Sequence, residues 1–437
     1  MNNVESIRAA GVVGCGGAGF PSHVKAASKA EFVVANGAEC EPLLHKDLEL
    51  MMREPEAIVS GMSLLMSVTG AQQGIIGVKK KYEEKLAGLQ GALRGSNMTL
   101  QLLGDYYPTG DEYVLVYETT KRLIPPQGIP LDVGVVVQNV ETLRNIHLAT
   151  HGHPSITKYI SVAGAVVHPS TFEVPIGISF AEVIQAAGGT TVADYVMFIS
   201  GIMMGKLEKD VTLPITKTCA GLIVLPVNHR LVQRKSLPLN AMLRIGKSAC
   251  DQCSFCTEFC PRYLLGYDVQ PHKVMRSLSF TTTGEDIWNQ SAQLCCLCGL
   301  CTLYSCPEDL YPKETCEKAK SDIRIKGIPW AGDRDVRIHP IYEGRHVPLK
   351  KLIEKLGIEE YDVPAHFVEK IFSPDRVRLP LLQHTGIPAI SMVSIGQRVT
   401  TGEVVAEVPQ GKQGSRIHAS IDGKIKNING EIVIERV

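Results

Sequence analysis

The sequence predicts a multidomain protein of mixed α/β and α+β class. Three observations support this prediction. Short apolar runs alternate with helical stretches in residues 1–150, two tight groups of cysteines lie in residues 236–330, and β-runs broken by glycines fill residues 381–437. A chain of 437 residues is long enough for about three domains. We therefore treat these segments as separate folding units.

The composition is that of an ordinary globular protein, with 44% hydrophobic and 21% charged residues. The formal net charge is zero and aromatic residues make up only 6%, so we expect no nucleic-acid binding. The longest apolar runs, residues 133–137 and 195–204, are far shorter than the ~20 residues that span a bilayer. Because residues 1–10 also lack a secretory signal, the sequence predicts a cytoplasmic protein without a membrane span.

Residues 1–150 have the pattern of an α/β domain. A long helical pattern covers residues 47–69, and Pro55 is expected to kink it or split it in two. The predicted strands are residues 32–35, 74–78 and 133–137.

Residues 155–235 predict a small β-grasp-like domain. Ser179 can cap a helix, and Glu182 three residues later completes a capping box. The expected order of strand, strand, helix and strand corresponds to residues 159–167, 171–174, 180–187 and 196–200.

The last two segments differ in character. Residues 331–380 are rich in charge and proline, which is typical of a linker, and contain one amphipathic helix near residues 349–356. Residues 381–437 carry regularly spaced glycines between short β-runs, which predicts a small all-β sandwich or barrel.

The cysteines form two runs that match iron–sulfur ligands. The runs are Cys250-x-x-Cys253-x-x-Cys256-x-x-x-Cys260-Pro261 and Cys295-x-x-Cys298-x-x-Cys301-x-x-x-x-Cys306-Pro307. Three cysteines at this spacing wrap a loop around one [4Fe–4S] cluster, and in two-cluster ferredoxins the fourth cysteine binds the other cluster. The predicted ligand sets are therefore Cys250, Cys253, Cys256 and Cys306 for one cluster, and Cys295, Cys298, Cys301 and Cys260 for the second.

Structural zinc is the alternative for these cysteines. Zinc sites usually pair two separated C-x-x-C motifs, whereas both runs here have three consecutive cysteines and then Cys-Pro. Cys296 lies beside Cys295 but has the wrong spacing to Cys298 to act as a ligand. Two neighbouring iron–sulfur clusters indicate electron transfer in single steps.

A glycine loop lies near the N-terminus, with the sequence Gly14-Cys15-Gly16-Gly17-Ala18-Gly19-Phe20-Pro21. It satisfies G-x-G-x-x-G, but a Rossmann site needs a proper strand before the loop and a long helix after it. Residues 9–13 are a short strand at most, and Pro21 follows the loop at once. A structural turn and a site for phosphate or a flavin ring both remain open, since glycine allows close approach to the backbone.

Three other segments of the same domain end strands or turns with polar groups. We expect them to share one crevice with the glycine loop, as ligand sites usually do. The segments are residues 36–42, 107–112 and 138–143.

Together these motifs resemble the flavin-binding domain shared by the NADH-oxidising flavoprotein subunit of respiratory complex I and the C subunit of Rnf complexes. The matching motifs are Gly-Gly-Ala-Gly-Phe-Pro, Asn-x-x-Glu-x-Glu-Pro, Gly-Asp-Glu and Asn-Val-Glu-Thr-Leu, at residues 16–21, 36–42, 110–112 and 139–143. The full order of flavin domain, SLBB-like β-grasp, ferredoxin-like dicluster module and barrel-sandwich hybrid resembles the cobalamin reductases of propanediol-utilization microcompartments. That resemblance covers nearly all of the chain.

The resemblance implies specific contacts to FMN and NADH. The residues implied to face FMN are Gly14, Gly16, Lys25, Asn36, Glu39, Gly110, Asp111, Asn139 and Thr142, with Gly17 and Gly19 in the same loop. The residues implied near NADH are Phe20, Glu41, Tyr107 and Glu112. Ala38 and Gln138 differ from the Asp and Asn of complex I, and the aromatic expected after Pro125-Pro126 is missing.

The resemblance implies an NADH-dependent cobalamin reductase. Electrons would pass from NADH through FMN and two [4Fe–4S] clusters, reducing cob(III)alamin to cob(II)alamin and then cob(I)alamin to reactivate a B12-dependent diol dehydratase. No Asp-x-His-x-x-Gly motif for binding cobalamin is present, so cobalamin is expected as a substrate, presented by a corrinoid adenosyltransferase. The location implied is inside a bacterial microcompartment, with shell proteins as further partners.

Two alternatives are kept. The first is a carrier similar to the C subunit of Rnf complexes, which delivers electrons to a ferredoxin or an amino-acid reductase. The second concerns the C-terminal segment, which resembles biotinyl and lipoyl barrel sandwiches. Lys424 follows Gly423 but lacks the flanking residues of a carrier lysine, which favours a packing or docking role.

Overall fold

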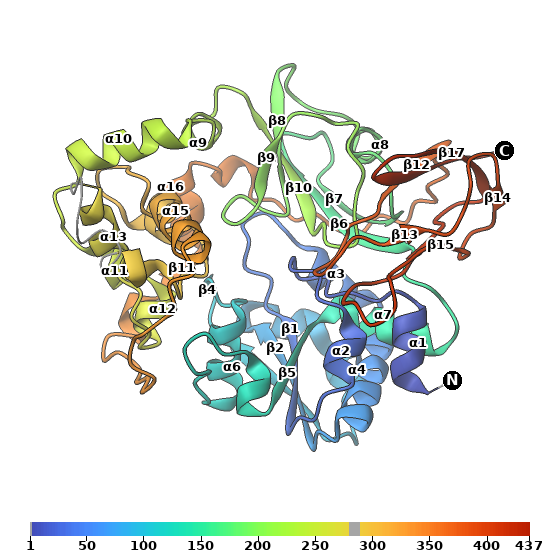
Figure 1. The fold of residues 1–437 in the computed structure, drawn as a ribbon, viewed down its shortest axis with the longest axis horizontal. Coiled ribbons are helices and arrows are strands. Elements are labelled where there is room, and N and C mark those ends of the chain that lie inside the picture. The colour runs from blue at the N-terminus through green and yellow to red at the C-terminus, as the bar shows by residue number, and fades with distance from the viewer. Residues whose placement is uncertain (1, 279–288) are drawn as a thin grey trace.

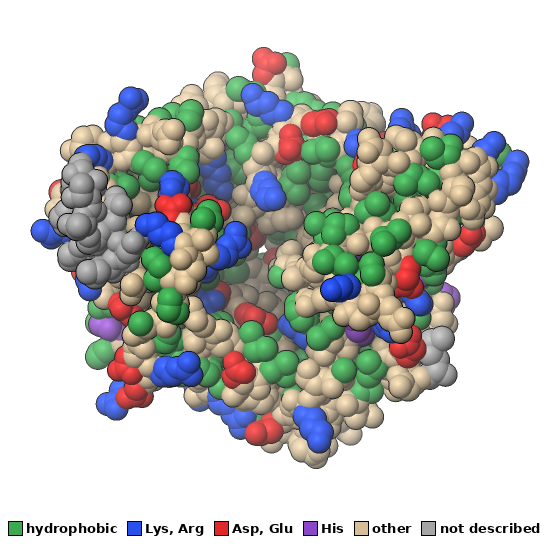
Figure 2. Space-filling view, viewed as in Figure 1, with side chains coloured by type: hydrophobic (Ala, Val, Ile, Leu, Met, Phe, Trp, Pro, Cys, Tyr) green, Lys and Arg blue, Asp and Glu red, His purple; other side chains and the backbone are tan. Residues whose placement is uncertain are grey.

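The computed structural model describes residues 2–278 and 289–437, and its four regions surround a common centre (Figure 1). In this view the N-terminal domain lies at the bottom, the β-grasp domain at the top, the cysteine-rich module at the left and the C-terminal β domain at the right. Figure 2 shows that this face is hollowed at its middle, where the regions meet. Within the described ranges, no helix combines the length and apolar character needed to cross a membrane.

The N-terminal domain contains a parallel sheet of four strands in the order β3-β2-β1-β5. Its strands are β1 (Phe32–Gly37), β2 (Gln73–Lys79), β3 (Met98–Leu103) and β5 (Val135–Asn139). Val33, Val34 and Ala35 are fully buried, which is typical of a parallel strand covered on both faces. The predicted α/β class is confirmed.

Helices cover this sheet on both sides. They are α1 (Asn3–Ala9), α2 (Ser22–Ala26), α3 (Lys46–Arg53), α4 (Pro55–Thr69), η1 (Lys80–Leu86), α5 (Ala87–Ala92), α6 (Glu112–Thr120), η2 (Pro130–Val133) and α7 (Val140–Thr150). Pro55 splits the predicted long helix and becomes the first residue of α4, where its missing N–H breaks no helical hydrogen bond.

The β-grasp domain has a five-stranded sheet in the order β7-β6-β10-β8-β9. Its elements are β6 (Thr157–Gly164), β7 (Ser170–Pro175), α8 (Phe180–Ala186), β8 (Tyr195–Ile199), β9 (Lys206–Glu208), β10 (Gly221–Pro226) and α9 (Arg230–Lys235). The predicted capping box of Ser179 and Glu182 is present at the start of α8.

The cysteine-rich module consists of short helices. They are α10 (Leu239–Ala249), α11 (Phe255–Glu258), α12 (Pro261–Leu264), α13 (Pro271–Ser277), η3 (Gln290–Ala292), η4 (Cys301–Ser305) and α15 (Pro312–Ile325).

The segment predicted as a linker packs against two other regions. It contains η5 (Glu343–Arg345), β11 (Val347–Pro348), α16 (Leu349–Leu356) and η6 (Glu359–Tyr361). Strand β11 pairs with β4 (Tyr106–Tyr107) of the N-terminal domain. Leu352 and Ile353 of α16 join an apolar core that also contains Cys298 and Leu303 of the cysteine module. The apolar stripe of α16 is therefore buried between domains.

The C-terminal domain is all-β, as predicted, and consists of two small antiparallel sheets. One sheet has the order β12-β18-β17-β14 and the other has the order β13-β15-β16. The strands are β12 (Arg376–Pro380), β13 (Ile390–Ser391), β14 (Arg398–Val399), β15 (Val404–Glu407), β16 (Ile417–His418), β17 (Gly423–Ile428) and β18 (Glu431–Glu435).

Candidate flavin and iron–sulfur sites

The parallel sheet brings the predicted flavin segments together at its carboxyl edge. Asn36 at the end of β1 is in register with Asn139 at the end of β5. The Asn36 side-chain amide donates a hydrogen bond of 3.0 Å to the Gly110 carbonyl. A Cβ at Gly110 would lie 2.9 Å from the Ala38 carbonyl oxygen, so only glycine fits this close approach. The edge therefore matches the usual position of a ligand crevice in an open α/β sheet.

The glycine loop faces this edge with exposed backbone. The Cys15 N–H donates to the Thr142 hydroxyl at 2.9 Å, which connects the loop to the first turn of α7. A Cβ at Gly16 would lie 3.6 Å from the Asn139 Cβ, and one at Gly17 would meet no atom within 4 Å. Gly17 also has a φ of +114°, in the left-handed region that favours glycine. The open backbone fits a flat ligand such as FMN.

Phe20, Lys25 and Glu112 form a small group beside the loop. The Lys25 Nζ lies 5.9 Å from the centre of the Phe20 ring and donates to the Val137 carbonyl at 2.9 Å. The same Nζ is 3.4 Å from a Glu112 carboxylate oxygen. An aromatic ring, a cation and a carboxylate are therefore presented together near the end of β5.

A buried charge network lies behind the sheet edge. The Lys46 Nζ is 2.5 Å from Asp47 and 3.1 Å from Glu141, and Glu141 also pairs with Lys158. The Glu39 carboxylate accepts the Asp47 N–H at 3.2 Å. Burial and the adjacent Asp47 carboxylate raise the pKa of Glu39. Glu39 is therefore fixed beside the site in a strongly charged environment.

Sequence reasoning missed the central members of this network, Lys46 and Asp47. Asp47 also accepts a hydrogen bond of 2.9 Å from the side-chain amide of Asn139, so it orients a predicted site residue. Both charged residues lie at the start of α3 and are almost fully buried. Charged residues in a first helical turn ordinarily face solvent, so the sequence alone contains no signal of their burial.

Asp111 connects the crevice to the cysteine module. One carboxylate oxygen accepts from Tyr113 N–H at 3.1 Å and caps helix α6, and the other is 3.0 Å from Arg262. The Arg262 guanidinium also lies 3.5 Å from the centre of the Tyr113 ring. Arg262 follows Cys260 by two residues, so this buried ion pair fixes the second cysteine set against the N-terminal domain.

Glu41 and Tyr107 have their polar atoms in contacts between domains. The Glu41 carboxylate accepts the N–H groups of Met203 and Met204, at 3.0 and 2.8 Å, in a loop of the β-grasp domain. The Tyr107 hydroxyl is buried and donates to the Cys298 carbonyl at 2.6 Å.

The first predicted cysteine set surrounds one pocket. Cys250, Cys253, Cys256 and Cys306 all line an empty volume of about 320 Å³. Gln252 and Ser254, on either side of Cys253, have φ values of 63° and 65°, and these left-handed turns let the short loop curve around the pocket. Cys253 is exposed whereas Cys256 and Cys306 are buried, so this set lies near the surface.

The second set is enclosed. Cys260, Cys295, Cys298 and Cys301 are each at most 8% exposed. Burial and the neighbouring Cys295 thiol raise the pKa of Cys260, and burial with Cys295, Cys256 and Cys260 nearby raises the pKa of Cys301. The influence of Cys256 on Cys301 indicates that the two sets are neighbours. Among residues 2–278 and 289–437, no three His, Cys, Asp or Glu side chains form a site for a single metal ion.

Hydrogen-bond donors and two further thiols flank the cysteines. The Leu297 and Leu310 N–H groups point at the sulfurs of Cys295 and Cys306, at 3.4 and 3.3 Å. Such donors stabilise thiolate ligands and raise cluster potentials. Buried Cys316 contacts the Cys295 thiol, and Cys296 contacts Cys298. The contact of Cys316 was not predicted, because 21 residues separate it from Cys295 in the sequence.

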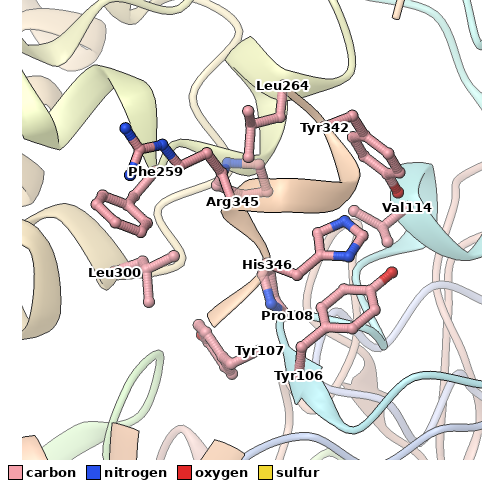
Figure 3. Close-up of a pocket in the computed structure, with 11 residues that line it drawn as sticks. Tyr106, Tyr107, Pro108, Val114, Phe259, Leu264, Leu300, Tyr342, Arg345 and His346 are labelled. Atoms are coloured by element: carbon pink, nitrogen blue, oxygen red, sulfur yellow. The ribbon is translucent and has the colours of Figure 1, made fainter. Parts of the chain in front are cut away.

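An apolar pocket separates the N-terminal domain from the cysteine module. Its empty volume is about 270 Å³. Figure 3 shows Tyr106, His346 and Tyr342 on one side of this pocket, with Phe259 and Leu300 opposite. Tyr106 and His346 are stacked with ring centroids 3.8 Å apart. The wall of the pocket therefore combines the N-terminal domain, the cysteine module and the segment predicted as a linker.

Comparisons with known proteins agree with this architecture. Four family models match: the Nuo51 FMN-binding domain at residues 7–148, the SLBB domain at 159–205, the 4Fe-4S dicluster domain at 249–311 and the RnfC barrel sandwich hybrid domain at 359–436. Cobalamin reductase PduS of Salmonella typhimurium is 39% identical over 433 residues, which cover 98% of this chain and 95% of the relative. This chain belongs to the PduS family.

Other relatives share parts or all of the chain. The PduS protein of Citrobacter freundii is 38% identical, with 98% of this chain and 95% of the relative covered. The RnfC-type component of the Na(+)-translocating ferredoxin:NAD(+) oxidoreductase complex of Acetobacterium woodii is 34% identical over 58% of this chain and 56% of its own length. A solved NAD+-reducing [NiFe]-hydrogenase chain is 20% identical with a TM-score of 0.49, covering 81% of this chain and 62% of that chain.

Proposed function

We propose that this PduS-family chain is an electron-transfer flavoprotein that uses NADH to reduce cobalamin. The observation that carries the proposal is the joining of an open glycine loop to two adjacent cysteine sets within one polypeptide, through the Asp111–Arg262 and Tyr107–Cys298 contacts. When bound, FMN accepts a hydride from NADH and releases electrons singly, and each [4Fe–4S] cluster carries one electron. The names of the full-length relatives supply cobalamin as the substrate class.

The chain's own residues would bind and orient the flavin. Gly14, Gly16, Gly17 and Gly19 would provide backbone without Cβ obstruction, and Asn36, Glu39, Gly110, Asp111, Asn139 and Thr142 would form the surrounding edge. Lys25 would supply a positive charge beside it. For NADH, Phe20 and Glu112 are the best placed of the predicted contacts, because Glu41 and Tyr107 are occupied between domains.

The two cysteine sets would act in a fixed order. We infer that the second set, Cys260, Cys295, Cys298 and Cys301, receives electrons first. Its members pack with Tyr106, Tyr107 and Val114 of the N-terminal domain. Cys250 and Cys306 of the first set pack with Met275, Leu278 and Leu310 of the cysteine module instead, and Cys253 is exposed. The first set would therefore pass electrons to the acceptor.

We infer that cobalamin is a visiting substrate, presented by a corrinoid adenosyltransferase inside a bacterial microcompartment with shell proteins nearby. The missing Asp-x-His-x-x-Gly motif supports a visiting role. The exposed position of Cys253 supports delivery to a large acceptor at the surface, because transfer requires the cluster edge to come close to the acceptor.

The experiment is an anaerobic assay of the purified protein with NADH and cob(III)alamin, with a small ferredoxin as the competing acceptor. The proposal predicts NADH-dependent bleaching of cob(III)alamin. Ferredoxin reduction without any corrinoid turnover would contradict it and favour the Rnf-like carrier, which the identity to RnfC-type proteins over about 60% of the chain makes the main alternative.

A further inference from the structure

The C-terminal barrel-sandwich domain contacts the glycine loop directly, although more than 360 residues separate them in sequence. The Thr385 hydroxyl donates a hydrogen bond of 2.6 Å to the Ala18 carbonyl. The Thr385 N–H donates one of 2.9 Å to the Gly19 carbonyl. One residue of the barrel therefore binds two consecutive carbonyls of the loop.

The same region packs tightly beneath the loop. Gly19 is buried, has a φ of +66°, and has no room for a side chain. A Cβ there would lie 2.7 Å from the Thr218 Cγ2 of the β-grasp domain and 3.1 Å from the His384 Cα of the barrel. The exposed tip of the loop, Gly16 and Gly17, is thus supported from below by two other domains.

A buried lysine joins the three domains next to this contact. Lys217 of the β-grasp domain is 3% exposed, and its Nζ donates to the carbonyls of Gly11 and Arg416, at 2.6 and 2.8 Å. Its backbone N–H donates to the Gln383 side-chain oxygen at 3.1 Å. Because Gly11 precedes the loop and Gln383 precedes Thr385, Lys217 fixes both partners of the contact relative to one another.

A loop with three glycines needs such outside contacts. Glycine has the largest conformational freedom of any residue, so ordering Gly16, Gly17 and Gly19 has a large entropic cost. Within the loop, the Gly14 N–H to Phe20 carbonyl bond of 2.9 Å closes the base. The bonds from Thr385 act on the far side, between the exposed tip and Phe20.

We propose that the barrel-sandwich domain is part of the flavin site, with Thr385 as a positioning residue that holds the glycine loop in the conformation that receives FMN. This inference rests on the proposed function, because it takes the glycine loop as the FMN site. It assigns to the C-terminal domain a role in flavin retention in addition to packing.

The test compares three variants of the full-length protein with intact clusters, after removal of flavin. Thr385→Val removes the bond to Ala18 but keeps the backbone bond to Gly19. Thr385→Ser restores the hydroxyl. Thr401→Val is the matched control, because Thr401 is an exposed threonine of the same domain whose hydroxyl binds only Asp422 among the described residues.

The readout is the dissociation constant for FMN, measured by quenching of FMN fluorescence during titration. Loss of one hydrogen bond predicts a dissociation constant about 2- to 10-fold higher for Thr385→Val. Thr385→Ser and Thr401→Val should bind as the wild type does. Thr385→Ala serves as a second variant that lacks the hydroxyl without adding a methyl group, and it should match Thr385→Val.

The outcomes separate the two proposals. If the wild type binds FMN and Thr385→Val and Thr385→Ala bind it equally well, the positioning role is wrong while the proposed function stands. If the wild type itself fails to bind FMN, both the flavin site and this inference are overturned. Equal weakening by Thr401→Val would also contradict the inference, because the effect would then not arise from the loop contact.

Discussion

Buried ionisable side chains lie where the domains of this protein meet. Arg262 pairs with Asp111 between the cysteine module and the N-terminal domain, and Glu41 accepts two backbone N–H groups of the β-grasp loop. Lys217 and His418 are buried at the junction with the barrel. Each of these groups would lose much more than a surface charge if its partner moved away, so they favour a single arrangement of the domains.

His418 gives this junction a predictable dependence on pH. Burial, with Lys217 and Arg416 nearby, lowers the pKa of His418 from 6.5 to about 3. The unfolded chain therefore takes up a proton below pH 6.5 that the folded chain does not, and stability falls as the solution is acidified. Between pH 7 and pH 5.5 this group alone should cost about 1 kcal/mol of unfolding free energy.

The measurement is the melting temperature of wild type and His418→Gln at pH 7 and pH 5.5. The variant, which cannot titrate at this position, should lose less stability on acidification than the wild type. The interpretation of His418 would be contradicted by equal losses in the two proteins.

At the scale of elements, helix α7 shows how local sequence positions the site. Asn139 ends β5 and begins α7, and its side-chain oxygen accepts the Glu141 N–H at 3.0 Å. Its amide group also donates to Asp47 at 2.9 Å. The turn from strand to helix therefore places Thr142, which binds the glycine loop, one turn into the helix.

Removing this cap should weaken both the helix and the flavin site. Asn139→Ala is expected to cost about 1 kcal/mol of stability from the lost cap alone. Because α7 also carries Thr142, FMN affinity should fall as well. Ser179→Ala is the matched control, since it removes the cap of α8 in the β-grasp domain at a similar cost.

Melting curves and FMN titrations of both variants check this prediction. Ser179→Ala should melt lower than the wild type yet keep its FMN affinity, and Asn139→Ala should lose both. A flavin affinity of Asn139→Ala equal to that of the control would show that the cap acts on stability only.

Elements with strong local signals were predictable from the sequence. Strand β1, the split at Pro55 and helix α16 follow from apolar runs, proline geometry and an amphipathic stripe. Strand β3 was missed because it lies at the sheet edge and only its end residues, Met98 and Leu103, are buried. Propensity alone does not distinguish such an edge strand from a loop.

At the scale of the whole molecule, the parts of the site that the sequence indicated are those with fixed spacing. Cysteine spacing predicted that Cys306 would join Cys250, Cys253 and Cys256, and all four line one pocket. Contacts across domains carry no such spacing. The packing of the segment predicted as a linker, the contact of Cys316 with Cys295 and the bonds from Thr385 to the glycine loop arise only when distant parts of the chain meet.

The most direct test of the central claim uses Cys298→Ala and Cys253→Ala, each of which should lose one of the two cluster sites and about half of ~8 iron atoms while keeping FMN. Anaerobic stopped-flow mixing with NADH, followed by rapid-freeze electron paramagnetic resonance, measures how fast the remaining cluster is reduced. In Cys253→Ala the enclosed cluster should be reduced as quickly as in the wild type. In Cys298→Ala the flavin should bleach normally while the surface cluster is reduced slowly; fast reduction of that cluster, or slow reduction of the enclosed one, would contradict the proposed path.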